Sequence, residues 1–270
     1  LGSRYAVLGL PIIRGVVNFG ESLYIGLKTL SYSSSFYEEE DYEPGKVEQF
    51  FTKIFGDKLE SVLMGITMVI SVILALGIFM VLPFFLTNLM KGFLPSYSIR
   101  TLIEGIIRVA LFLIYIWLIS KMEDIKRVFM YHGAEHKTIN CLEHGEDLTP
   151  ENIKKYSRLH KRCGTSFLLI VMIVSIVVFM FIRVDSLVWK FVLRILLVPI
   201  VAGISYEFIR LAGRSDSKIV NTLSKPGLYL QYFTTREPDE EMMEVAIKAV
   251  EGVFDWREYL RAMHNGELED

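Results

Sequence analysis

The chain has 270 residues, 52% of them hydrophobic, and its 31 acidic residues slightly outnumber its 29 lysines and arginines. A mean hydropathy of +0.38 together with this apolar content exceeds what soluble globular domains show, so the composition points to membrane-spanning segments. The net charge of −2 gives no information about nucleic acid, and because no basic patch with interleaved aromatics is present, nucleic acid is not an expected partner.

The N-terminal segment predicts a surface helix. The opening letters LGSRYAV lack an initiator methionine and an apolar signal region, so we expect a fragment of a longer chain. Residues 10–31 place apolar side chains at helical spacing, with Arg14 and Glu21 on one face. We interpret this stretch as an amphipathic helix on the inner membrane surface, and a functional groove is the alternative. An acidic loop (33–45) and a short helix (46–60) follow.

Four apolar segments predict membrane-spanning helices. The first and third contain no charge and reach the roughly 20 residues that cross a bilayer. The second and fourth have shorter charge-free cores, and buried helices of a soluble domain are the alternative for them. The four segments are 61–86, 104–120, 164–182 and 187–206.

The distribution of lysine and arginine predicts the orientation. The loop 87–100 has only two such residues, whereas the segment 121–163 has nine, which places that segment and both termini in the cytoplasm. Cysteines in a cytoplasmic segment are reduced thiols, so ligand or catalytic roles outrank a disulfide. The nine residues are Lys121, Lys126, Arg127, Lys137, Lys154, Lys155, Arg158, Lys161 and Arg162.

We therefore expect an all-α polytopic membrane protein with three regions. Residues 1–60 form cytoplasmic amphipathic and juxtamembrane helices. Residues 61–210 form a four-helix membrane domain with a cytoplasmic helical hairpin at 121–163. Residues 211–270 form cytoplasmic C-terminal helices, with a Pro-Gly turn after the first and a final helix over 238–253.

A histidine pair carries the clearest chemical signal. His132 and His136 are four residues apart, so both imidazoles lie on one side of a helix, with Glu135 between them. The pattern H-x-x-E-H is the inverted zinc-protease arrangement, in which two histidines bind metal and the glutamate handles a proton. The alternative is ordinary surface chemistry on a polar helix.

The residues that follow predict a helical hairpin. Gly145 is a C-cap, Thr149 is an N-cap, and Pro150 stands at the first position of the next helix. Two antiparallel helices that turn near residue 147 bring His160 level with the histidine pair and Cys163 level with Tyr131. Three histidines and a thiol then converge, and zinc takes this mixture of nitrogen and sulfur.

The same geometry excludes the other soft ligands of the segment. Cys141 lies on the opposite side of the helix from His132, and His144 stands at the solvated hairpin tip. A straight second span would carry His132 roughly 16 Å below its apolar end, whereas Cys163 directly precedes the third span. Either the second helix tilts or bends, or the ligands do not all meet.

Further charged residues lie at the ends of the spans. Glu207 and Arg210, three apart, predict a helix-end ion pair, with a ligand or base role for the glutamate as the alternative. Glu104, Arg108 and Arg194 either form a charge cluster in the outer leaflet or snorkel to the interface, and we favour snorkelling.

Longer stretches resemble the YqhQ-like family of uncharacterised bacterial membrane proteins. They are LPIIRGVVNFGESL, YHGAEHKTINCLEHGEDLT, YSRLHKRCGTSF, AGISYEFIRLAGR and KPGLYLQYFTTREP, and they cover almost the whole chain. The resemblance implies a bacterial inner-membrane protein of a family predicted to be a metal-dependent enzyme. The residues that belong to its motifs are His132, Glu135, His136, His160, Arg162, Cys163, Glu207 and Arg210.

Two functions fit these observations best. The first is a zinc-dependent hydrolase at the cytoplasmic membrane face, with metal on His132, His136 and either His160 or Cys163, and Glu135 as the base. The second is a non-enzymatic factor of protein-insertion or envelope machinery, in which the cluster only pins the hairpin. Expected partners are the bilayer and a membrane protein or second copy. Transport is disfavoured because the spans contain few polar groups.

Overall fold

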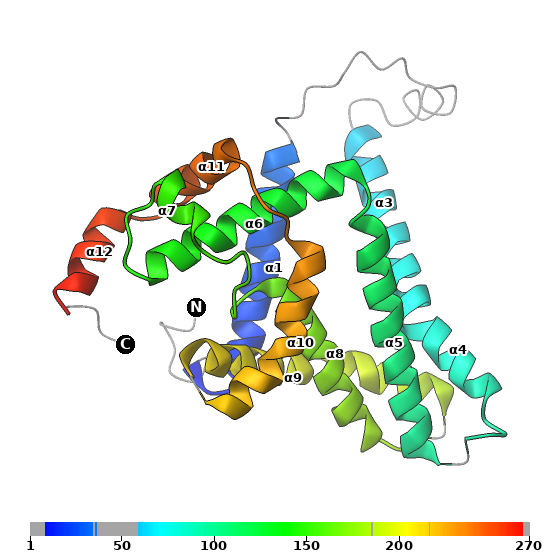
Figure 1. The fold of residues 1–270 in the computed structure, drawn as a ribbon. Coiled ribbons are helices and arrows are strands. Elements are labelled where there is room, and N and C mark those ends of the chain that lie inside the picture. The colour runs from blue at the N-terminus through cyan, green and yellow to red at the C-terminus, as the bar shows by residue number, and fades with distance from the viewer. Residues whose placement is uncertain are drawn as a thin grey trace. The chain divides into compact units, whose positions relative to one another are not determined.

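The computed structural model describes residues 9–34, 36, 59–94, 96–184, 186–215 and 217–266, and these residues form helices and connecting loops without strands (Figure 1). This confirms the all-α prediction. The predictions for 37–58, which comprise most of the acidic loop and of the short helix after it, lie outside the described residues.

Three described helical stretches are long and apolar enough to cross a membrane: Gly65–Leu89, Tyr97–Ile119 and Val188–Arg214. They correspond to the first, second and fourth predicted spans. The third predicted span forms α8 (Gly164–Met180), an apolar helix of 17 residues. Its length of about 26 Å lies at the short end of the range for crossing, so a membrane crossing by α8 stays a prediction.

Residue contacts divide the chain into two compact units. The first comprises Leu1–Leu111 and Phe179–Gly203, and the second comprises Phe112–Val178 and Ile204–Asp270. Helices α5 (Tyr97–Ile119) and α9 (Leu187–Arg214) each carry the chain from one unit to the other.

The first unit contains α1 and an interrupted helix, in addition to parts of α5 and α9. The bounds are α1 (Ile13–Ser34), α3 (Leu59–Leu76), the π-helical turn η3 (Gly77–Val81) and α4 (Leu82–Leu89). Helix α1 confirms the helix predicted over 10–31. Pro83 has no N–H for the carbonyl of Phe79, four residues earlier, and that oxygen instead accepts a hydrogen bond from Arg108 Nε at 2.8 Å.

A buried carboxylate organises the charged residues of the first unit. Glu104 is 2% exposed and accepts hydrogen bonds from both terminal nitrogens of Arg194, with Nη2 at 3.0 Å. Arg108 Nη2 lies 3.1 Å from the same carboxylate and Lys190 Nζ lies 3.5 Å from it. The snorkelling interpretation of these arginines is therefore wrong, because a buried carboxylate holds their heads inside the unit.

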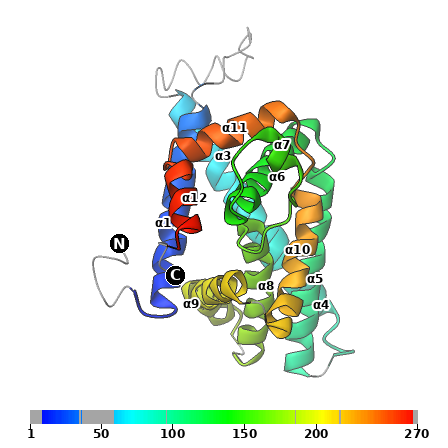
Figure 2. The same cartoon turned by 60° about the vertical axis from the view of Figure 1, so that its left-hand side comes forward.

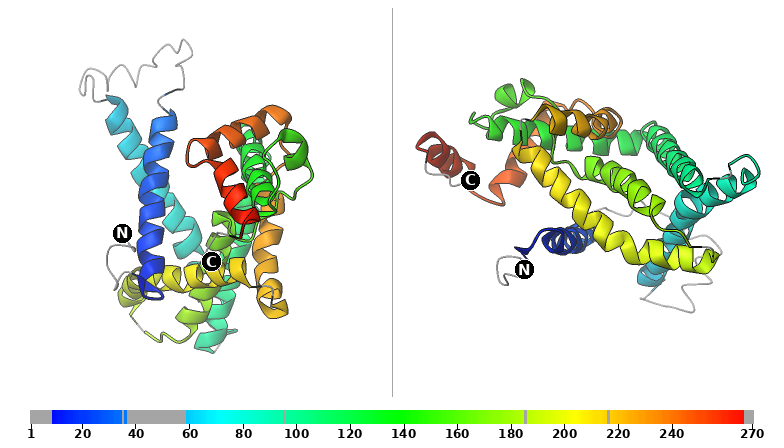
Figure 3. Two further views of the ribbon diagram at one scale, coloured as in Figure 1. Left: turned by 90° about the vertical axis from the view of Figure 1, so that its left-hand side faces the viewer. Right: turned by 90° about the horizontal axis from the view of Figure 1, so that it is seen from below.

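The second unit has a core between the helices that follow α5. It contains most of α8 and parts of α5 and α9, together with α6 (Glu123–Glu143), α7 (Pro150–Lys154), α10 (Lys218–Thr234), α11 (Glu240–Glu251) and α12 (Trp256–His264). Helix α11 lies against α6 and α7 in each ribbon view (Figures 1, 2 and 3). The buried residues between these helices are Cys141, Leu142, Leu148, Ile153, Met243, Trp256 and Leu260.

Two C-terminal predictions were wrong. Helix α10 continues through Pro226 and Gly227, where a turn was predicted. A Cβ at Gly227 would lie 2.9 Å from Ser166 Cβ, so glycine here serves the close approach of α10 to the first turn of α8. Helix α11 matches the helix predicted over 238–253, but α12 follows it, with Asp255 as its N-cap.

The hairpin has one helical arm and one irregular arm. Helix α6 ends at Glu143, Gly145 follows with φ +77°, and Thr149 caps α7, all as predicted. The second arm, predicted as a helix to about residue 160, is helical only to Lys154. The helix is also interrupted between Ile119 and Glu123, where the chain changes direction, so the second predicted helix bends, which was one of the two alternatives (Figure 1).

Candidate metal centre

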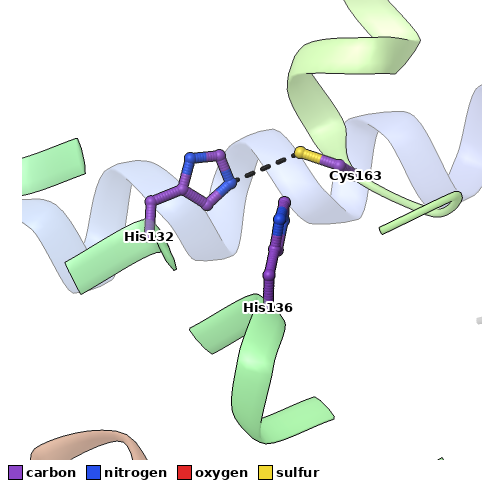
Figure 4. A group of neighbouring side chains, drawn as sticks. All are labelled: His132, His136 and Cys163. Carbon is purple, nitrogen blue, oxygen red and sulfur yellow. Dashed lines mark hydrogen bonds between the residues drawn. The ribbon is translucent and has the colours of Figure 1, made fainter. Parts of the chain in front are cut away.

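Two histidines of α6 and a cysteine that directly precedes α8 point toward one another (Figure 4). His132, His136 and Cys163 each offer one ligand atom, and these atoms lie within 4.8 Å of one another. His132 Nε2 is 3.3 Å from Cys163 Sγ, and the two imidazole rings are 4.3 Å apart. The structure therefore brings three of the four predicted ligands into one group that could hold a metal ion.

Main-chain carbonyls hold the other nitrogen of each histidine in the group. His132 Nδ1 lies 2.8 Å from the Thr234 oxygen, and His136 Nδ1 lies 2.7 Å from the Arg158 oxygen. A carbonyl oxygen only accepts hydrogen bonds, so both Nδ1 atoms carry the proton and donate it. In each neutral ring the Nε2 lone pair is then left for the group around Cys163. Metal-binding histidines are oriented in this way by a partner at their second nitrogen.

The dimensions of the group suit zinc. Zinc binds histidine nitrogen at about 2.0–2.1 Å and thiolate sulfur at about 2.3 Å, which in a tetrahedron places the two ligand atoms about 3.5 Å apart. The distance between His132 Nε2 and Cys163 Sγ is 3.3 Å. Three protein ligands would leave one tetrahedral position for water or substrate, whereas a structural zinc site closes with four.

Electrostatics favour the thiolate that a metal requires. Burial alone would raise the pKa of Cys163. Hydrogen bonds from His132 and His136, whose protonated rings carry a hydrogen on Nε2 as well, and from Thr165 outweigh burial and lower the pKa from 9.0 to about 5. Burial would likewise lower the pKa of His132, yet its contact with Cys163 raises that pKa. Cys163 also precedes the first turn of α8, where the helix dipole stabilises an anion.

His160, the fourth predicted ligand, is engaged elsewhere. Its Nε2 lies 3.1 Å from Glu143 Oε2, and its Nδ1 accepts a hydrogen bond from the Arg162 amide at 3.3 Å. Its ring lies 5.8 Å from that of His136, so it is a neighbour of the group but has no nitrogen to give it. Arg162 also pairs with Glu143. The hydrogen bond from His160, more than any other contact, lowers the pKa of the Glu143 carboxyl.

Glu135 stands at an open cleft beside the three ligands. The cleft has a volume of about 390 Å³, and the walls are formed by His132, Glu135, His136, Ile139, Glu143, His160, Arg162, Cys163 and Gly164. Glu135 is exposed and contributes to the raised pKa of His132 through its charge. A second, apolar groove of about 600 Å³ shares Glu135, Ile139 and Glu143 with the cleft and continues over α11 and α12.

The segment that follows α10 docks along α6 and supplies much of the support. The Arg236 amide donates to the Phe129 carbonyl at 2.8 Å, and a Cβ at Gly133 would lie only 2.0 Å from the Arg236 oxygen. Lys137, which is 4% exposed, pairs with Glu237. This docking positions the Thr234 carbonyl against His132.

Sequence reasoning missed these supporting residues. Gln231, fully buried on α10, accepts from the His160 amide at 2.8 Å and donates to the His160 carbonyl at 2.7 Å. Its Nε2 also lies 2.7 Å from Ser166 Oγ, which ties α10 to the start of α8. The signal in the sequence that could have indicated them is the stretch LYLQYFTTREP, whose polar residues had no predicted role.

The remaining candidates lie apart from the group. Cys141 is fully buried in the apolar core, which raises its pKa to about 11, and His144 is exposed, both in line with their exclusion. Glu207 and Arg210 are partly buried on α9, and neither lines the cleft.

The fold and the site define a class: a helical, membrane-associated protein with a candidate His/His/Cys metal centre. The chain belongs to the family described as "Protein of unknown function (DUF1385)", which matches residues 10–256. It is 37% identical over 241 residues to "Uncharacterized protein YqhQ" of Bacillus subtilis (strain 168), covering 89% of this chain and 76% of that protein. The YqhQ-like resemblance is thus confirmed. No solved structure matches the chain.

Proposed function

We propose that this protein is a metal-dependent hydrolase of the bacterial inner membrane, with His132, His136 and Cys163 as zinc ligands. The observation that carries the proposal is the pair of Nδ1–H bonds to main-chain carbonyls, which directs two Nε2 atoms to one thiolate. A bound zinc would act as a Lewis acid and lower the pKa of a water molecule. Three protein ligands favour this function over a purely structural site.

Glu135 is the proposed base. It is exposed, it precedes the ligand His136 directly, and it lines the cleft that the three ligands face. A carboxylate there can accept a proton from water and return it to a leaving group. Glu143 is the less suitable base because its carboxylate is paired with His160 and Arg162.

The apolar groove supports a substrate with an acyl or alkyl chain. It shares three residues with the cleft, so a chain in the groove would bring its polar end to Glu135. Burial of each CH₂ group contributes about 0.8 kcal/mol, which favours long chains over short ones. Esters with acyl chains of increasing length would test this preference, and equal turnover of short and long chains would contradict it.

Elemental mass spectrometry of purified protein for zinc, iron, manganese and nickel tests the metal. We expect bound zinc in wild type, its loss in His136→Ala, and its retention in His144→Ala, a matched change of an exposed histidine in the segment after α6. Glu135→Gln should keep the zinc and lower turnover by about 10²–10⁴-fold. Protein without metal, or equal losses in the two histidine variants, would refute the site.

A non-enzymatic role in insertion or envelope machinery is the second candidate. It requires the cluster only as a clamp between α6 and the start of α8. Cells that carry Glu135→Gln distinguish the two functions: a structural cluster predicts normal growth, and a hydrolase predicts the phenotype of a deletion.

We further propose four spans, including α8, with both termini in the cytoplasm. The nine cations of 121–163 support this orientation. In a cysteine-free background, an impermeant reagent added to whole cells should label Phe93→Cys and spare Asp147→Cys. Labelling at 147 from outside would reverse the topology. The partners we propose are the bilayer and a membrane protein or second copy.

A further inference from the structure

A small polar pocket lies in the first unit, apart from the proposed metal centre. It has a volume of about 180 Å³ and is formed by α4, the loop after it and the first turns of α5 and α9. That volume corresponds to about six water molecules, which is enough for a phosphate group. Its walls are Phe84, Thr87, Asn88, Lys91, Tyr97, Arg100, Thr101, Glu104, Val184 and Lys190.

The described residues of this pocket carry more positive than negative charge. Among them, Lys91, Arg100 and Lys190 face a single carboxylate, that of Glu104. That carboxylate is already bonded to both terminal nitrogens of Arg194, which is 5% exposed. Arg100 and Lys190 are partly buried and Lys91 is exposed, so an anion in the pocket would offset the cost of the two partly buried cations.

The pocket also offers a hydrogen-bond donor that lacks an acceptor. Arg100 Nε is buried and has no hydrogen-bond partner. Lys190 Nζ lies 4.6 Å from the ring centre of Phe84 and 5.7 Å from that of Tyr97, so aromatic faces hold the ammonium group at the wall. A guanidinium and an ammonium on opposite helices form a recognised arrangement for a tetrahedral oxyanion.

We propose that this pocket binds a phosphate group, held between Arg100 and Lys190 with Lys91 at its exposed mouth. The phosphate belongs either to the headgroup of an anionic phospholipid or to a soluble phosphate compound. Helices α5 and α9 are candidate membrane spans, and the pocket lies near their N-terminal ends, which the proposed topology places at the outer headgroup region of the bilayer. The site is independent of the metal centre and of the hydrolase.

Thermal unfolding of the full chain in a non-ionic detergent, followed by tryptophan fluorescence, tests the proposal. The additives are dihexanoyl phosphatidylglycerol, inorganic phosphate, and sodium chloride at matched ionic strength. We expect phosphatidylglycerol or phosphate to raise the Tm of wild type above the chloride value. Arg100→Gln should lose this rise, and Lys28→Gln, which removes an equal charge from an exposed site on α1, should keep it.

The additives separate the two sources of phosphate. A rise with phosphatidylglycerol alone assigns a lipid headgroup, and an equal rise with inorganic phosphate assigns a soluble compound. Native mass spectrometry of wild type provides a measurement that needs no variant, since a phosphate-bearing adduct should survive. The proposal is wrong if wild type shows neither rise nor adduct, or if Arg100→Gln keeps the full rise.

Discussion

Replacement of Gly133 by alanine should disrupt the metal centre without touching a ligand. The new Cβ would lie 2.0 Å from the Arg236 oxygen, and ordinary van der Waals contact begins at 3.4 Å, so the docked segment must move by about 1.4 Å. The nearest atoms all belong to the backbone of Arg236, so no side chain can rotate away to relieve the clash.

A movement of that size breaks two hydrogen bonds of 2.8 Å, from the Arg236 amide to Phe129 and from His132 to Thr234. At about 1–2 kcal/mol for each buried group left unpaired, we expect Gly133→Ala to lower the free energy of unfolding by about 2–4 kcal/mol. Loss of the carbonyl that orients His132 should weaken zinc binding by about 10–100-fold.

Chemical denaturation measures the first effect, and competition with a chromogenic chelator measures the second. Gly164→Ala is the matched control, because it adds the same methyl group next to Cys163 where nothing lies within 4 Å. It should change stability by less than about 1 kcal/mol. If Gly133→Ala matches Gly164→Ala in both assays, the docking of the 234–237 segment does not support the site.

Three further outcomes follow from burial and charge. In metal-free protein at pH 6, Cys163, with its pKa of about 5, should be about 90% thiolate and react with iodoacetamide, whereas Cys141, with its pKa of about 11, should not react. Mass spectrometry of peptides measures the modification of each cysteine, and faster modification of Cys141 than of Cys163 would contradict the lowered pKa of Cys163. Glu104→Gln leaves buried cations unpaired and should cost about 3–5 kcal/mol in unfolding free energy, and a loss below about 1 kcal/mol would contradict the buried cluster. Glu207→Gln should lower stability by about 1 kcal/mol or less and keep the metal content, so loss of metal in the folded variant would make Glu207 a ligand.

Helices and caps were predictable because their causes are local. The spacing of apolar residues predicted α1, and uninterrupted apolar runs predicted the three helical stretches long enough to cross a membrane. Gly145 marked the end of α6, and Thr149 and Pro150 marked the start of α7. The placement of the His132 and His136 imidazoles on one side of α6 was predictable from the helical period alone.

The rest depended on contacts between residues far apart in sequence. The prediction of His160 as a ligand was wrong because α7 ends at Lys154. Residue 160 was placed opposite the histidine pair by assuming a helical rise of 1.5 Å per residue in both arms, and irregular chain advances farther per residue than that. The turn expected at Pro226 is absent because packing of Gly227 on Ser166 overrides local preference. The Thr234 carbonyl, 102 residues from His132, left no pattern that spacing could detect.

That separation has a consequence for the order of events during biosynthesis. The proposed ligands His132, His136 and Cys163 leave the ribosome well before Thr234, which emerges only after the whole of α9 has been made. A nascent chain that stops at Arg214 would hold all three ligands, yet its His132 would lack the carbonyl that fixes its tautomer. Loading of the proposed ion should then be a late step of maturation that follows synthesis of α9 and α10, and the cell would have to keep the Cys163 thiol reduced until then.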